Sequence, residues 1–232
     1  MKKLLLLALL TLGLQAKEIY ATFDVVANQK ANIAFNASGV VEKIFVDIGS
    51  EVKKGDIVAK LENNDTKSML DSAKNSYKYA KKDLDRQYRV RNIIEEAKLD
   101  AYSNKFNSAK HQLNYQQILY DRTYLKAPFD GVVSDQKVEI GDVVSGMMLT
   151  TAFTIQSNND IKLLLKFDSK YWQKIKVGDA FRYTLDGSTE EHNGTISKIY
   201  PTIDPKTRLM KAEVLTQDIP IGLFGSGYIV VK

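Results

Sequence analysis

The chain has 232 residues with a formal net charge of +5, two histidines and no cysteine. The absence of cysteine excludes disulfides, thiolate metal sites and a lipid anchor on cysteine. The basic excess is small and dispersed, which argues against nucleic-acid binding. With so few histidines there is little material for catalysis or metal binding, so the sequence predicts neither an enzyme nor a bound cofactor or metal.

The first 16 residues have the features of an export signal. A basic start at residues 1–3 precedes a leucine-rich run at 4–10, and Ala16 offers a cleavage point. The apolar run is shorter than the roughly 20 residues that span a bilayer. Leu14 stands where a small residue is preferred, which leaves an uncleaved N-terminal anchor open. We expect residues 1–16 to be a signal peptide and the mature chain to be periplasmic.

A strand-like stretch follows at residues 18–35. We expect it to join the β-rich C-terminal part of the chain, so that residues 17–37 and 150–232 form one β-barrel domain. The chain would then enter and leave through the same domain, and the residues between would form the rest of the molecule.

A short pattern of glycines and valines occurs twice further along the chain. Each copy has two valines after its first glycine and an alternating V-x-I-G, which is typical of half-buried strands ended by tight turns. Because neither copy can bury its apolar face alone, we expect the copies to pack together. Residues 38–64 and 124–149 are therefore predicted to form one β domain. The glycines of the pattern are Gly39, Gly49 and Gly55 in the first copy and Gly131, Gly141 and Gly146 in the second.

The segment between the two copies, residues 65–123, contains no Gly and no Pro. Apolar residues recur there at spacings of three and four, as in a coiled coil. Pairing Leu84 with Phe106 and Tyr77 with Leu113 gives one constant sum of residue numbers, 190, as an antiparallel hairpin requires.

This pairing places the turn of the hairpin near residues 92–96. Each arm of roughly 28 residues would be about 42 Å long at 1.5 Å per residue. Near the turn, Gln87 and Arg91 take positions where the pattern wants apolar residues, whereas Ile93 and Ile94 stand at the tip. Two interpretations stay open for this end: a frayed hairpin or a docking surface for another protein.

The last third of the chain changes to a period near two. A short helix is expected at residues 168–175, with Tyr171 and Trp172 facing the core. Several short strands separated by turn signals suggest a small barrel. Strands are expected at 161–167, 180–185, 194–200, 209–215 and 228–231. The fold class is thus mostly β with a long α-helical hairpin: a split β domain, an antiparallel coiled coil and a small barrel.

The stretch Ala127-Pro128-Phe129-Asp130-Gly131-Val132-Val133, with its first-half counterpart around Gly55, resembles the lipoyl-like domain of a known family. Split lipoyl-like halves around a helical hairpin, followed by a barrel, are similar to the periplasmic adaptor subunits of bacterial tripartite RND-type efflux pumps. These are the membrane fusion proteins of the HlyD-like family. The chain stops on the apparent last barrel strand, so we expect the family's membrane-proximal domain to be absent or reduced.

The resemblance implies a non-catalytic adaptor. It would bridge an inner-membrane efflux transporter to an outer-membrane, TolC-like channel protein, and it would self-associate into a ring, with six copies expected. The hairpin tip would meet the channel, and multidrug export is the expected class. The docking region implied at this tip comprises Arg89, Arg91, Asn92, Ile93, Ile94 and Glu95.

Three other interpretations share some of these sequence features. An ABC-type exporter could use the same adaptor architecture. A lipoyl or biotinyl carrier would need a modified lysine in the hairpin where the helices are inserted, and none is recognisable. A heavy-metal exporter is the third, but core packing explains Met69 and Met210 better than metal binding does, and only Met147 and Met148 are adjacent. Both histidines, His111 and His192, are expected at the surface.

Overall fold

A computed structural model describes residues 17–92, 95–148 and 150–231 of the chain. The predicted signal peptide, residues 1–16, lies outside the described residues. The chain divides into two compact units. One contains the residues up to Gln29 together with those from Ser157 onward, and the other runs from Lys30 to Gln156.

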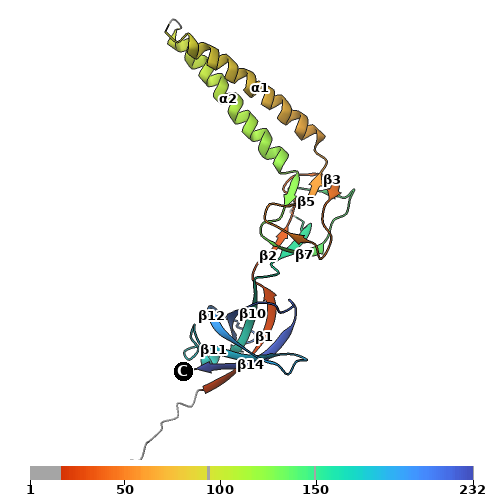
Figure 1. Cartoon of the computed structure of the whole chain (residues 1–232), viewed down its shortest axis with the longest axis vertical. Coiled ribbons are helices and arrows are strands. Elements are labelled where there is room, and N and C mark those ends of the chain that lie inside the picture. The colour runs from red at the N-terminus through yellow and green to blue at the C-terminus, as the bar shows by residue number, and fades with distance from the viewer. Residues whose placement is uncertain (1–16, 93–94, 149, 232) are drawn as a thin grey trace, which may run out of the picture. The chain divides into compact units, whose positions relative to one another are not determined.

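The first unit is a closed antiparallel barrel of six strands in the order β1-β10-β13-β12-β11-β14 (Figure 1). Strand β1 is hydrogen-bonded to both β10 and β14, which closes the sheet into a barrel. Every strand therefore has a hydrogen-bonded neighbour on both sides. The strands are β1 (Lys17–Ala27), β10 (Ile161–Asp168), β11 (Ala180–Leu185), β12 (Glu191–Ile203), β13 (Leu209–Thr216) and β14 (Phe224–Val231). The C-terminal strands expected from the sequence are therefore present.

Side chains fill the barrel interior because strand residues alternate between its two faces. Along β10 every second residue is buried. Phe23, Phe167 and Phe181 are at most 1% exposed. The ring of Tyr183 lies 5.2 Å from that of Phe23 and 5.4 Å from that of Phe181, centroid to centroid. The barrel thus has a core of its own.

The helix expected at residues 168–175 is wrong in extent. Only a 3₁₀ turn, η1 (Ser169–Tyr171), forms there, begun by the Asp168 carboxylate accepting the Lys170 N–H at 2.9 Å. Tyr171 packs partly against the barrel core, but Trp172 is 58% exposed. The prediction failed for Trp172 because one short turn cannot direct two neighbouring side chains to the same face.

The second unit contains two four-stranded sheets with one and the same internal order. One sheet runs β2-β9-β7-β4 and the other β6-β5-β3-β8, and every pairing within them is antiparallel. Exchanging the two copies of the glycine pattern converts one order into the other. The strands are β2 (Lys30–Ile33), β3 (Gly39–Ile44), β4 (Glu51–Val52), β5 (Ile57–Leu61), β6 (Tyr124–Lys126), β7 (Gly131–Gln136), β8 (Val143–Val144) and β9 (Phe153–Gln156).

Two strands that the sequence assigned to the barrel belong to this second unit. Strand β2 pairs with β9, and β9 pairs with β7. The expected barrel segments 17–37 and 150–232 are therefore too long at their inner ends. The physical reason is that β2 completes one sheet as β6 completes the other, which alternation along the strand does not reveal.

Helices α1 (Asn64–Arg89) and α2 (Glu96–Asp121) connect β5 to β6. They lie side by side in Figure 1, and residues 90–95 join them. The expected turn at residues 92–96 falls in and next to this connection. In the part of the chain that the structure describes, no helix is both long and apolar enough to cross a membrane.

Candidate functional site

The two copies of the glycine pattern are joined by matched hydrogen bonds. The Gly49 N–H donates to the Val133 carbonyl at 2.8 Å, and the Gly141 N–H donates to the Val41 carbonyl at 2.9 Å. Gly49 and Gly141 are 92 positions apart, as are Val41 and Val133, so one bond maps onto the other. This confirms that the copies are neighbours, and it relates them by an approximate two-fold axis.

The motif glycines serve different purposes. Gly49, Gly55 and Gly141 have φ angles of +87°, +92° and +96°, which side chains with a Cβ rarely adopt. Gly146 has no such angle, but a Cβ there would come within 2.8 Å of the Asn36 backbone. Two others begin strands at ordinary φ angles: Gly39 opens β3 and Gly131 opens β7.

The Asp130 side chain forms a bridge between the two halves of the domain. Its Oδ1 accepts the Lys54 N–H at 2.7 Å. In the equivalent place the Ser38 hydroxyl accepts the Gly146 N–H at 3.0 Å. Of its neighbours in the motif, Phe129 packs against the core of this unit and Pro128 is exposed. The motif therefore holds the domain together.

A buried polar group ties together the two ends of the helical insertion. The Asn63 side-chain amide donates to the Thr123 hydroxyl at 3.1 Å, and the Thr123 hydroxyl donates to the Tyr120 carbonyl at 2.7 Å. The hydroxyls of Tyr120 and Tyr124 lie 2.7 Å apart. This hydrogen bond, with burial, raises the pKa of Tyr120 to about 12, and the same bond lowers the pKa of Tyr124. The helices thus leave the β domain from a fixed base.

The helices meet along the expected apolar seam, and one further contact joins them. Among the described residues, α1 buries Leu70, Ala73, Ala80 and Leu84, whereas α2 buries none fully. The ring of Tyr77 lies 5.4 Å from that of Phe106, centroid to centroid. The expected pairing of Phe106 with Leu84 overlooked this contact, because an aromatic side chain reaches beyond the partner assigned by backbone position.

The far end of the helical pair carries the predicted docking residues. Arg89 is the last residue of α1, and Arg91, Asn92 and Glu95 follow in the connection; all four are exposed. Ile93 and Ile94 lie outside the described residues. The structure brings the described four together in one exposed end.

Charged side chains are organised just before this end. Asp83 on α1 pairs with Arg86 and, at 3.6 Å, with Lys105 on α2. The Arg86 hydrogen bond lowers the pKa of the Asp83 carboxyl. Among the described residues, no group of three or more His, Cys, Asp and Glu side chains could hold a metal ion. His111 is exposed, and the ring of His192 stacks on that of Tyr183 at 5.3 Å.

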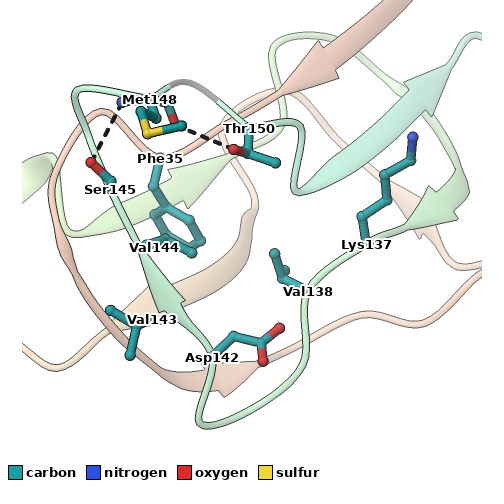
Figure 2. Close-up of a pocket in the computed structure, with 9 residues that line it drawn as sticks. All are labelled: Phe35, Lys137, Val138, Asp142, Val143, Val144, Ser145, Met148 and Thr150. Atoms are coloured by element: carbon teal, nitrogen blue, oxygen red, sulfur yellow. Dashed lines mark hydrogen bonds between the residues drawn. The ribbon is translucent and has the colours of Figure 1, made fainter.

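One feature of the β domain was missed by reasoning from the sequence. A cavity of about 370 Å³ lies beside strand β8 (Figure 2). Phe35 and Val138 line it as nearly buried residues, whereas Val143 and Met148 line it as residues that are 82% and 75% exposed. The signal available in the sequence was the adjacent pair Met147 and Met148, in a loop longer than its counterpart in the first copy.

Comparison with known proteins gives the family. The profile of the CzcB-like, barrel-sandwich hybrid domain matches residues 29–156, which is more than half of the chain and includes the whole second unit. The chain belongs to this CzcB-like family. The match has the boundaries of the structural unit and includes β2 and β9, which the sequence had assigned to the barrel.

This CzcB-like chain is similar to the cobalt-zinc-cadmium resistance protein CzcB of Cupriavidus metallidurans. The two are 22% identical over 204 residues, which cover 81% of this chain and 39% of that protein. This chain therefore spans about two fifths of the length of the curated relatives that it matches first.

Solved structures share the fold. A MacA–MexA chimeric protein that contains the Pseudomonas aeruginosa MexA α-hairpin domain superposes with a TM-score of 0.85 at 17% identity, covering 94% of this chain and 83% of that one. The membrane fusion protein Spr0693 of Streptococcus pneumoniae R6 gives a TM-score of 0.72 at 18% identity, covering 92% and 98%. The fold is that of membrane fusion proteins.

Proposed function

We propose that this chain is a periplasmic adaptor, associated with the inner membrane, that bridges an inner-membrane efflux transporter to an outer-membrane channel protein. The observation that carries the proposal is the helical pair inserted between two halves of one β domain. The inserted helices cannot be a detached linker, because their two ends are hydrogen-bonded to each other through Asn63 and Thr123. The role requires no catalytic residue.

The helical pair is suited to reach a partner. Each helix has 26 residues, which gives a length of about 39 Å at 1.5 Å per residue. We propose that the pair acts as an antiparallel coiled-coil arm. Its apolar seam packs α1 on α2, and its exposed end carries Arg89, Arg91, Asn92 and Glu95 toward the channel protein.

The cargo that we favour is a divalent heavy-metal cation. The relative from Cupriavidus metallidurans is named for cobalt, zinc and cadmium resistance. Multidrug export, the class expected from the sequence, is the second candidate and is favoured by the likeness to a MacA–MexA chimera. The adaptor need not bind either cargo, so its own residues do not decide between them.

The docking role is tested by photo-crosslinking in the source cells. A photoreactive residue at Asn92 is expected to capture an outer-membrane channel protein. The same residue at Asn75, which is exposed in the middle of α1, is the matched control and should not capture it. Capture from Asn75 alone, or from neither site, would contradict the docking assignment.

The cargo is tested by deleting the gene and measuring growth. Deletion should lower the tolerated concentration of zinc, cobalt or cadmium salts, and the wild-type gene should restore it. If only tolerance of organic drugs changes, the adaptor function stands and the cargo is the multidrug class. If neither tolerance changes, the efflux role itself is contradicted.

A further inference from the structure

The approximate two-fold symmetry of the β domain is broken at one loop. Val41 pairs with Leu61 in the first copy, and Val133 pairs with Ile155 in the second. The two valines are 92 positions apart in the chain, whereas their partners, Leu61 and Ile155, are 94 positions apart. The second copy therefore contains two additional residues, which lie in the loop between β8 and β9, the counterpart of the loop between β4 and β5. Met147 and Met148 lie in the longer loop.

The shorter loop is hydrogen-bonded to Ala127, which directly follows strand β6. The Gly55 N–H donates to the Ala127 carbonyl at 2.8 Å, and the Ala127 N–H donates to the Asp56 carbonyl at 2.9 Å. The position equivalent to Ala127 in the other half is Phe35, whose ring lines the 370 Å³ cavity (Figure 2). In the first half the shorter loop is hydrogen-bonded to its neighbour. At the equivalent place in the second half, the longer loop and the Phe35 ring leave a cavity instead.

The rim of the cavity combines apolar groups with a carboxylate. Val143 and Met148 are both highly exposed. The exposed Asp142 also lines the cavity, and one of its oxygens accepts the Glu139 N–H at 2.7 Å. Lys137, a second charged lining residue, pairs with Asp135 at 3.6 Å. An apolar group with an attached positive charge would match this rim.

The first half of the same chain presents such a group. Phe45, the position equivalent to Lys137, is 48% exposed. The Lys43 ammonium lies 5.0 Å from the centre of the Phe45 ring, within the range of a cation–π contact. Ile48, at the turn next to it, is 60% exposed. An aromatic ring with a neighbouring cation is thus left in solvent.

We propose that the Lys43–Phe45 pair of one copy of this chain docks into the cavity lined by Phe35, Asp142 and Val143 of a second copy. The Phe45 ring would cover the apolar lining, and the Lys43 ammonium would face the Asp142 carboxylate. A methionine beside an aromatic ring adapts readily to its shape. The charges are complementary, and both partners are surfaces of the same domain.

The contact has a defined symmetry. The Lys43–Phe45 pair and the cavity lie on opposite sides of the approximate two-fold axis and differ in shape. The contact is therefore heterologous, because each copy offers its Lys43–Phe45 pair to one neighbour and its cavity to the other. Such contacts close into a ring when the rotation allows. The inference rests on the proposed adaptor function only in naming how the expected ring is held.

Cysteine crosslinking tests the contact in the full chain, which has no native cysteine. The variant with Ile48→Cys and Val143→Cys keeps the Lys43–Phe45 pair, and Ile48 is 60% exposed at the adjacent turn. It should form a ladder of oligomers under oxidising conditions, because each chain then links to two neighbours. Either single variant should lack the ladder. A pair of Met69→Cys and Val143→Cys is the matched control, because Met69 is 55% exposed but lies on α1. A ladder from this control, or none from the test pair, overturns the proposal.

A charge exchange tests the complementarity. Lys43→Glu and Asp142→Lys should each lower the ladder yield several-fold, and the two together should restore it. Phe45→Ala should lower the yield without touching the Asp142 turn, so it remains informative if Asp142→Lys misfolds. Equal yields in all variants overturn the proposal. If the cysteine variant supports export in cells but forms no ladder, the proposed contact is wrong and the adaptor function stands. If the ladder forms but the cells do not depend on the protein for export, the adaptor function is wrong and the contact stands.

Discussion

The barrel and the helical pair bury their apolar residues to different extents. The barrel encloses large side chains such as Phe23 and Leu165, which are at most 1% exposed, and closure leaves it without a free edge. Among the described residues, α1 buries four side chains and α2 buries none fully. The barrel is therefore stabilised by its own interior, whereas the helical pair leaves much of its surface for other contacts.

The largest expected effect is a truncation in the barrel core. Phe23→Ala should lower the free energy of unfolding by about 3–5 kcal/mol, because it removes a buried ring and leaves a cavity beside Phe181 and Tyr183. Denaturant titration followed by the fluorescence of Trp172, the one tryptophan of the chain, would measure it. A loss below that of an exposed-residue control such as Tyr20→Ala would contradict a self-contained barrel core.

A truncation in the helical seam should cost less. Leu84→Ala should destabilise the helical pair by about 2 kcal/mol, at the low end for leucine, because its side chain is already 9% exposed and the facing helix α2 buries none of its described side chains fully. Circular dichroism and amide exchange of the helices would detect it. Tyr79→Ala, at 61% exposure, is the matched control and should change little. A Leu84→Ala cost equal to that of Phe23→Ala would remove the contrast between the units.

A third effect depends on pH and concerns Glu213, a buried carboxyl of the barrel. Burial opposes ionisation of Glu213, but hydrogen bonds from Lys162 (2.6 Å) and Tyr200 (2.5 Å) outweigh it and lower the pKa of this carboxyl. Because the folded-state pKa is lowered, the stabilisation is present above the unfolded-state pKa and is lost as the pH falls through the folded-state value. Glu213→Gln should cost about 1.5 kcal/mol at neutral pH, as expected for a lost bond to a charged group.

Thermal melts at several pH values would check this. The difference in melting temperature between wild type and Glu213→Gln should be large at pH 7 and should vanish in acid. Asp168→Asn is a control at an exposed carboxyl whose pKa is also lowered, by the Lys170 N–H. A difference that does not depend on pH would contradict the assignment to Glu213.

The smallest expected effect is at the base of the helices. Asn63→Ala should cost about 1 kcal/mol, because it removes one buried hydrogen bond, to Thr123. Amide exchange should increase near the first turn of α1 and the last turn of α2 and stay unchanged in the barrel. Faster exchange in the barrel would show that the two units are coupled more closely than the contrast implies.

Much of the fold was predictable because it is written in local periodicity. The absence of Gly and Pro across residues 65–123 and the apolar residues at spacings of three and four indicated two helices, and α1 and α2 are present. Alternation indicated β10, β11 and β13 nearly to the residue. The docking residues at the helix end stay a prediction, because a partner's surface leaves no periodic trace.

The predictions that failed depend on which faces meet. Trp172 and Tyr171 are neighbours in the sequence, but only Tyr171 packs on the core. Strand β2 looks like part of the barrel, yet it bonds to β9 in the other unit. The glycine pattern predicted tight turns, yet one of its glycines, Gly131, begins a strand opposite Val52. None of these is decided by residues within one turn or one strand.

By itself, the sequence determined that a β unit occurs twice, that two helices separate the copies and that short strands follow. These features repeat at fixed spacings, and backbone geometry converts each spacing into one kind of element. Only the tertiary structure decided that the copies bond through Gly49 and Gly141 as near-equivalents, and that the cavity at Phe35 departs from this equivalence. Both depend on contacts between residues some ninety positions apart, which local periodicity in the sequence does not determine.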